Sequence, residues 1–258
     1  MPERSTVSAD RGGFLPWLIF CLAASGYGYA FFQRVAPGVM TQELMRDLGV
    51  SAAALGSLSA AYFYAYAGLQ IPVGVILDRW GARWVLILAI TLGAAGSVLF
   101  GLAETLEVAL LGRLAIGAGV ATAYLGSLKI AATWFPPQRF ALMAGLILPF
   151  GMVGAISAQL PLAALVEAVG WRVPMLGAAG FAALLAFLLW LTRLARPRRR
   201  AEPHPQLPLS AVLAGFARAL RERQTWLIAA SVALGTVPIL AFPGLWGVPY
   251  LMASYGID

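Results

Sequence analysis

The sequence contains one five-residue pattern twice, and the two copies lie 89 residues apart. Each copy lies at the end of a long apolar run, and three such runs separate equivalent points, so the copies emerge on opposite faces of a membrane. The pattern predicts an internal duplication with inverted orientation, which is typical of secondary transporters that work by alternating access. A chance match in a glycine- and proline-rich membrane chain is the alternative. The matched positions are Gln70, Pro72, Asp78, Gly81 and Arg83 in one copy, and Gln159, Pro161, Glu167, Gly170 and Arg172 in the other.

The composition places the chain in a membrane. Apolar residues make up 60% of the sequence and charged residues 11%, whereas a soluble domain has about 25% charged residues. A membrane-spanning helix needs about 20 mostly apolar residues. We therefore expect an all-α membrane protein whose termini lie on opposite sides of the bilayer. The sequence has seven sufficiently long runs, at about residues 14–36, 52–77, 84–103, 106–131, 140–166, 173–192 and 225–247.

The basic residues predict the orientation. Most arginines fall on the N-terminal side of this map, as Arg79, Arg83 and Arg139 do, while the other loops carry mainly acidic residues such as Glu43 and Asp47. Cytoplasmic loops are enriched in arginine and lysine, so we expect a cytoplasmic N-terminus and a multi-pass protein of the plasma membrane, such as a bacterial inner membrane. The net charge of +7 then reflects topology. We expect no nucleic-acid partner, because the basic residues lack interleaved aromatics in a soluble fold.

The apolar runs divide the chain into four parts. We expect a cytoplasmic N-terminus at 1–13, a six-helix transmembrane domain at 14–192, a basic linker at 193–224, and at 225–258 the first helix of a C-terminal transmembrane domain whose remainder is missing. Within the linker, residues 209–220 have apolar residues at helical intervals, with arginines nearby. They form either a short helix at the membrane surface or a solvated charge run.

The loop between the second and third runs resembles a signature of the major facilitator superfamily. Gly74, Asp78, Arg79, Gly81 and Arg83 fill that pattern. The resemblance implies two inverted three-helix repeats in a six-helix bundle, followed by a linker and one further transmembrane helix. It also implies that these five residues act as a conformational gate.

A second resemblance lies in the fourth run, where Arg113 is followed by Gly117 as in the arginine-containing fourth-helix motif of the same superfamily. Ionisable residues inside a bilayer are costly and usually face a cavity or a partner. Arg113 therefore either lines the central path or pairs with a backbone carbonyl. Arg34, near the end of the first run, either binds an anion with its planar fork of donors or extends to the membrane interface.

Polar residues in the second run lie on one face of the expected helix. Steps of three and four residues separate them, so they form a stripe that suits a cavity wall, although interfacial tyrosine belts give a similar pattern. The stripe contains Ser59, Tyr62, Tyr66 and Gln70. Further substrate-path candidates are Tyr27, which shares a face with Arg34, Tyr124, which shares a face with Arg113, and Gln159, the repeat partner of Gln70.

These features predict alternating-access transport of a small hydrophilic solute, with an organic anion as one candidate. The solute, the lipid bilayer and a C-terminal half are the expected partners. The alternative is a truncated membrane protein that does not transport and acts as a sensor or assembly partner. We expect no enzyme, metal or cofactor, because the spans hold no constellation of catalytic or metal-binding residues. The middle of the first six spans also lacks Asp and Glu, so uniport and anion exchange stay open beside proton coupling through an acid elsewhere.

The orientation can be tested with a single cysteine at Thr41, in the loop between the first two spans. We expect Thr41→Cys to react with an impermeant maleimide added from outside the cell, because the charge bias places this loop outside. Labelling only from the cytoplasmic side would contradict the orientation.

Overall fold

The computed structural model describes residues 13–192, 209–241 and 255. It divides into two compact units, residues 1–201 and 202–258, and each is described by itself. Within the first unit, six stretches are long and apolar enough to cross a membrane. They correspond to the six spans predicted for residues 14–192, with ends that differ by at most three residues.

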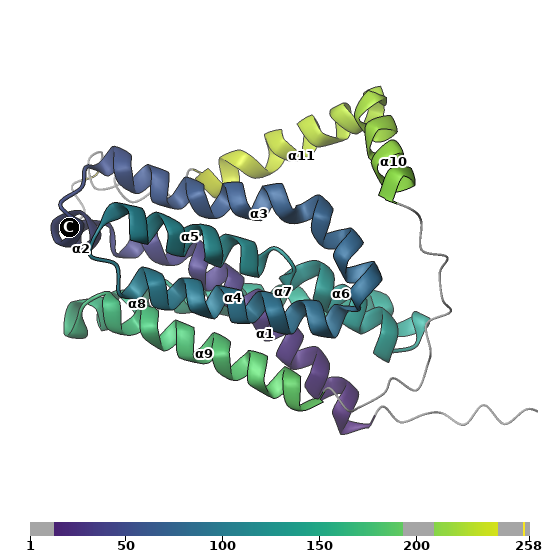
Figure 1. The fold of residues 1–258 in the computed structure, drawn as a ribbon, viewed down its shortest axis with the longest axis horizontal. Coiled ribbons are helices and arrows are strands. Elements are labelled where there is room, and N and C mark those ends of the chain that lie inside the picture. The colour runs from purple at the N-terminus through teal and green to yellow at the C-terminus, as the bar shows by residue number, and fades with distance from the viewer. Residues whose placement is uncertain (1–12, 193–208, 242–254, 256–258) are drawn as a thin grey trace, which may run out of the picture. The chain divides into compact units, whose positions relative to one another are not determined.

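Four of these spans are single helices, and two are interrupted (Figure 1). The single helices are α1 (Phe14–Val39), α3 (Ala52–Trp80), α4 (Ala82–Gly101) and α9 (Arg172–Leu191), with the short α2 (Thr41–Leu48) between α1 and α3. The fourth span consists of α5 (Leu106–Val120) and α6 (Ala123–Trp134). The fifth consists of the 3₁₀ turn η1 (Pro137–Arg139), α7 (Phe140–Ser157) and α8 (Leu160–Val169).

The interruption between α7 and α8 distinguishes the two copies of the sequence repeat. Pro161 is the second residue of α8, and its ring in a continuous helix would clash with the carbonyl of Ser157. Pro72, the equivalent residue of the first copy, lies inside the continuous helix α3. The apolar run predicted at about 140–166 is therefore one span that is broken at Ala158 and Gln159.

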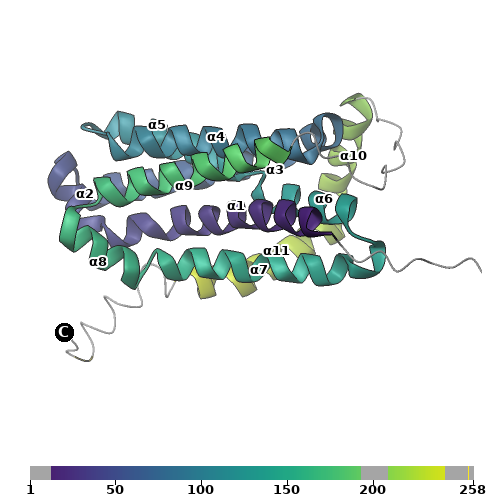
Figure 2. The ribbon, with the colours of Figure 1, turned by 90° about the horizontal axis from the view of Figure 1, so that it is seen from below.

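The helices pair across the two repeats. The first repeat consists of α1, α3 and α4, and the second of α5–α6, α7–α8 and α9. Helix α1 packs on α7, α5 packs on α3, and α4 packs on α9. Figure 2 shows α4 beside α9 and α1 beside α7. Each helix of one repeat therefore has a partner in the other, as an internal duplication requires.

Two glycines of equivalent position allow the close contacts between repeats. Gly28 and Gly117 lie 89 residues apart. A Cβ atom on Gly28 would be 2.8 Å from the carbonyl oxygen of Phe150, and one on Gly117 would be 2.3 Å from that of Tyr62. Small residues let backbones approach closely in membrane bundles, so these two positions extend the repeat beyond the five-residue pattern.

The repeated glycines Gly81 and Gly170 have nearly the same backbone conformation. Their φ and ψ angles are 81° and 142° at Gly81 and 77° and 166° at Gly170. Each lies where a second helix of a repeat ends and the third begins. Side-chain-bearing residues rarely adopt this region, which explains why both copies carry glycine.

In the second unit, the described residues form α10 (Leu209–Arg221) and α11 (Arg223–Ala241). The indole nitrogen of Trp226 donates a 2.8 Å hydrogen bond to the carbonyl of Leu220 at the junction. The short helix predicted within the linker is therefore present, and its place at a membrane surface stays a prediction. The seventh predicted span begins in α11 and continues beyond the described residues.

The glycine conformations generate a stability prediction. We expect Gly81→Ala and Gly170→Ala each to lower the free energy of unfolding by about 1–3 kcal/mol, because alanine is strained at these angles. Steric-trap unfolding in mixed micelles measures this loss.

The matched control is Gly180→Ala. Gly180 lies inside α9, and a Cβ atom there would meet nothing within 4 Å. We expect this control to stabilise the helix slightly. An equal loss of unfolding free energy in all three variants would contradict the explanation from backbone conformation.

Candidate functional site

Arg34 lies in a cluster of aromatic side chains from α1, α3 and α6. We use the term aromatic cluster for Tyr27, Phe31, Tyr62, Phe63, Tyr66 and Tyr124. The central guanidinium carbon of Arg34 lies 4.6 Å from the ring centroid of Phe31, 5.5 Å from that of Tyr66 and 5.7 Å from that of Phe63. Aromatic faces attract cations by about 0.5–2 kcal/mol each. The cluster therefore orients the guanidinium without neutralising its charge.

The donors of Arg34 are not all satisfied. Its Nε atom is buried and has no hydrogen-bond partner, and among the described residues Arg34 forms no ion pair. The side chain as a whole is half-buried. A positive group that has a missing acceptor and access from outside the bundle suits an anionic ligand.

Arg113 has a different environment. Its side chain is 1% exposed, its Nη1 donates a 2.8 Å hydrogen bond to the carbonyl of Gln33, and its Nε donates a 3.4 Å hydrogen bond to the carbonyl of Leu58. The Gln33 carbonyl has no helical donor, because residue 37, four positions later, is a proline that lacks an N–H group. Arg113 therefore satisfies an acceptor that Pro37 leaves free inside α1.

This geometry supports the second alternative for Arg113, pairing with carbonyls. Its guanidinium also lies 4.7 Å from the ring of Tyr62, whose hydroxyl donates a 3.0 Å hydrogen bond to the carbonyl of Ala30. Tyr62 is buried and stacks on Tyr66 at 6.2 Å. The role of Arg113 as a path residue stays a prediction.

A buried polar network between α1 and α4 was not predicted. The Tyr29 hydroxyl lies 2.6 Å from the Ser97 hydroxyl and donates to the Gly93 carbonyl at 2.9 Å, and Gln33 Nε2 donates to Ser97 at 2.8 Å. All three side chains are buried. Because Gln33 also supplies the carbonyl that Arg113 binds, the network connects Arg113 to α4. A glutamine and a serine inside apolar runs were the available sequence signal.

The residues of the predicted stripe of α3 have different surroundings, and its role as a cavity wall stays a prediction. Gln70 Nε2 donates to the carbonyl of Ala121 at 3.3 Å, at the break between α5 and α6. Ser59 and Tyr66 are half-buried. Gln159, the repeat partner of Gln70, is exposed in the break between α7 and α8. The stripe therefore contains Gln70, which binds a carbonyl of another span, and also Tyr62 and Tyr66, which belong to the aromatic cluster around Arg34.

The two remaining tyrosines of the predicted path belong to the aromatic cluster. The ring of Tyr27 lies 4.9 Å from Phe31 and 5.3 Å from Tyr124. Tyr27 and Tyr124 are both half-buried. The structure thus brings together Tyr27, Arg34, Tyr62, Tyr66 and Tyr124, from three different spans.

The signature loop lies at the other end of α3. Asp78 forms an ion pair with Lys129 of α6, and Arg83 donates to the carbonyl of Thr192 at 2.6 Å. Arg79 is exposed, and a Cβ atom on Gly74 would meet nothing within 4 Å. The ion pair of Asp78 with Lys129 and the hydrogen bond from Arg83 to Thr192 both lie within the first unit, and the gate role of the loop stays a prediction.

The arrangement of six spans, with the signature loop after the second and a buried arginine in the fourth, can be compared with known families. A family model described as Major Facilitator Superfamily matches residues 17–258. The chain belongs to this superfamily. The resemblance indicated by the sequence motifs is confirmed. Its relatives are transporters and not enzymes.

Three curated relatives show the range of similarity. The uncharacterized transporter YybO of Bacillus subtilis is 28% identical over 180 residues, which are 70% of this chain and 41% of the relative. The probable sulfoacetate transporter SauU of Cupriavidus necator is 27% identical over 60% of this chain and 35% of its own length. The probable galactarate/D-glucarate transporter GudP of Bacillus subtilis is 27% identical over 75% of this chain and 42% of its own length.

The fold matches a solved transporter. The crystal structure of a bacterial homolog of the human lysosomal transporter Spinster, inward-facing and unoccupied, superposes with a TM-score of 0.72 at 24% identity. The match covers 95% of this chain and 57% of that chain. At this identity the likeness shows the fold alone, and the chain spans less than half the length of the curated relatives that it matches.

The pairing of Arg113 with the carbonyl freed by Pro37 can be tested with a double-mutant cycle. We expect Arg113→Met to lower the free energy of unfolding by about 1–3 kcal/mol, because the buried Gln33 carbonyl loses its donor. In a Pro37→Ala background, the substituted residue supplies an N–H group to that carbonyl, so the loss should be smaller by about 1 kcal/mol. Steric-trap unfolding measures all four proteins. Additive losses would show that Arg113 does not act on this carbonyl.

Proposed function

We propose that this protein transports a small organic anion by alternating access, and that Arg34 binds the anionic group. The observation that carries the proposal is the environment of Arg34. Its half-buried guanidinium lies against three aromatic rings, its Nε lacks a partner, and among the described residues it has no carboxylate counter-ion. A planar fork of donors matches carboxylate, sulfonate or phosphate oxygens.

The named relatives support an anion. SauU is a probable sulfoacetate transporter and GudP a probable galactarate/D-glucarate transporter. Both named solute types carry anionic groups at neutral pH. The aromatic cluster supplies apolar surface and the hydroxyl groups of Tyr27, Tyr66 and Tyr124 beside Arg34, which can contact the body of such a solute.

Alternating access requires a second half. In this fold the solute site lies between two halves that rock about it, so we propose that a C-terminal transmembrane domain faces the aromatic cluster. In that complete transporter, Asp78, Arg79 and Arg83 with Gly74 and Gly81 form the cytoplasmic gate. The inner membrane of a bacterium, with the N-terminus in the cytoplasm, is the proposed location.

Uptake into proteoliposomes tests the role of Arg34. The transporter that contains this half is reconstituted and offered a panel of labelled carboxylates, sulfonates, sugars and amines. We expect saturable uptake of an organic anion. We also expect Arg34→Gln to raise KM by about 10- to 100-fold, because a charge-assisted hydrogen bond contributes about 1.5–3 kcal/mol.

The matched control is Arg46→Gln, which removes an exposed arginine whose ion pair is with its neighbour Asp47. We expect its KM to stay unchanged. An unchanged KM in Arg34→Gln would remove Arg34 from the site. Absence of uptake of every compound would favour the non-transporting alternative, a sensor or assembly partner.

A further inference from the structure

Two arginines make equivalent contacts across the repeats. Arg83, in the first repeat, donates to the carbonyl of Thr192 at the end of the second repeat, at 2.6 Å. Arg172, in the second repeat, donates to the carbonyl of Ala103 at the end of the first, at 3.1 Å. The two donors lie 89 residues apart, and so do the two acceptors. Each arginine thus donates to a carbonyl at the end of the third helix of the other repeat.

Both acceptors lie where a helix ends. Thr192 is the C-cap residue of α9, and Ala103 lies two residues beyond Gly101, the last residue of α4. The last carbonyls of a helix have no donor within it and carry the negative end of the helix dipole. A guanidinium therefore satisfies them by hydrogen bonding and by charge.

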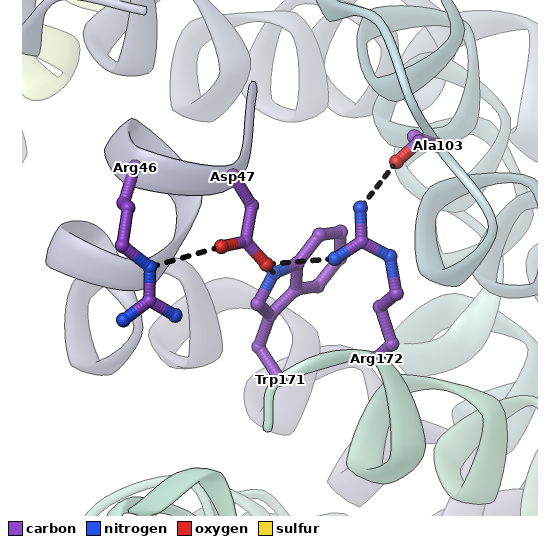
Figure 3. A network of polar contacts seen from close by, with 5 residues as sticks. All are labelled: Arg46, Asp47, Ala103, Trp171 and Arg172. Atoms are coloured by element: carbon purple, nitrogen blue, oxygen red, sulfur yellow. Dashed lines mark hydrogen bonds and ion pairs between the residues drawn. The ribbon is translucent and has the colours of Figure 1, made fainter. Parts of the chain in front are cut away.

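The contact at Arg172 includes an ion pair with Asp47 of helix α2, between α1 and α3 (Figure 3). The Nη1 atom of Arg172 lies 2.7 Å from Oδ2 of Asp47, and the indole nitrogen of Trp171 donates to the same oxygen at 3.0 Å. Figure 3 shows the guanidinium bridging Asp47 and the Ala103 carbonyl. One arginine of the second repeat therefore holds two segments of the first.

The carboxylate of this contact is ionised at neutral pH. The hydrogen bond from Trp171, followed by those from Arg46 and Arg172, lowers the pKa of Asp47 below its usual value. A lowered pKa means that the carboxylate contributes stability above its unfolded pKa and loses it only as the pH falls through the folded value. The ion pair thus persists at every pH well above the ordinary carboxyl range.

The contact at Arg83 includes a stacked aromatic ring. Its guanidinium carbon lies 5.0 Å from the ring centroid of Trp134, the last residue of α6. At the opposite end, the guanidinium carbon of Arg172 lies 4.5 Å from the ring of Trp171. Each arginine therefore packs on a tryptophan and donates to the other repeat.

We propose that Arg83 and Arg172 are a symmetric pair of braces, one at each end of the α4–α9 pair, that fasten the two three-helix repeats into one rigid body. The repeat brace at Arg172 consists of Arg172, Asp47, Trp171 and the Ala103 carbonyl. The repeat brace at Arg83 consists of Arg83, Trp134 and the Thr192 carbonyl. This proposal gives Arg172, which lies outside the signature loop, a role in fastening the two repeats. The proposal does not depend on the identity of the solute.

Hydrogen exchange of the full chain in detergent micelles tests the braces. We expect Arg172→Ala to speed amide exchange at the end of α4, residues 100–103, by about tenfold, and Arg83→Ala to do the same at residues 189–192. The effect should therefore appear in the repeat that was not changed. We also expect each variant to lower the melting temperature by about 3 °C or more.

The chain offers a control at each end. Arg46→Ala removes an exposed arginine beside Asp47, and Arg139→Ala removes an exposed arginine near Trp134. We expect neither control to change exchange in the other repeat. Arg172→Lys should recover the contact with Asp47 and only part of the protection at 100–103, because an ammonium lacks the fork that bridges both acceptors.

Asp47→Asn provides a second test if an alanine variant fails to fold. It keeps an oxygen for Trp171 and removes the charge, so we expect a smaller rise in exchange at residues 100–103 and at Trp171. Faster exchange confined to the changed repeat, or controls that match the brace variants, would overturn the proposal.

Discussion

Backbone carbonyls without a helical donor determine where several polar side chains of this protein lie. The hydrocarbon core offers no water, so each carbonyl that loses its helical donor needs another one. Pro37 releases the carbonyl of Gln33, which Arg113 binds, and the break between α5 and α6 releases that of Ala121, which Gln70 binds. Just beyond α4 and at the end of α9, the carbonyls of Ala103 and Thr192 accept hydrogen bonds from the brace arginines. In each case the donor belongs to a different helix, so satisfying the carbonyl also fastens two helices together.

This requirement separates structural polar residues from the candidate site. Arg113 and Gln70 donate to backbone oxygens of their own half, although the buried Nη2 of Arg113 has no hydrogen-bond partner. Arg34 lies against three aromatic faces and, among the described residues, forms no ion pair. Arg34 is half-buried and Arg113 is 1% exposed, so Arg34 is the more accessible of the two arginines. This difference in exposure is why the proposed function depends on Arg34.

The sequence predicted the spans of residues 14–192, because hydropathy over about 20 residues is a strong signal. Gly81 and Gly170 were identified as matched positions of the repeat, and the structure adds that their backbone conformations are nearly the same. The breaks at Ala121 and Ala158 were not predicted, because the surrounding runs stay apolar through them. The acceptors of Arg113 could not be predicted either. Pro37 shows that a carbonyl is free, and only the packing of α5 against α1 and α3 shows which side chain reaches it.

The sequence predicted individual residues of the candidate site, and it did not predict that these residues form one cluster. Tyr27, Arg34, Tyr66 and Tyr124 were identified from helical spacing within single spans. That these residues lie together depends on how α1, α3 and α6 pack, which a single sequence does not specify. Phe31 and Phe63 contribute to the same cluster, and no polar character distinguished them from packing residues.

The direction of the buried contacts along the chain has a consequence for biogenesis. Both acceptors of Arg113 precede it, by 80 and 55 residues, so they are already synthesised when the fourth span leaves the ribosome. An arginine within a span is costly to insert, and Arg113 enters beside carbonyls that can offset part of that cost. Arg83 is the reverse case, because its acceptor follows it by 109 residues. That contact can form only after the sixth span has been synthesised. The contact at Arg83 is therefore the last of these contacts to form.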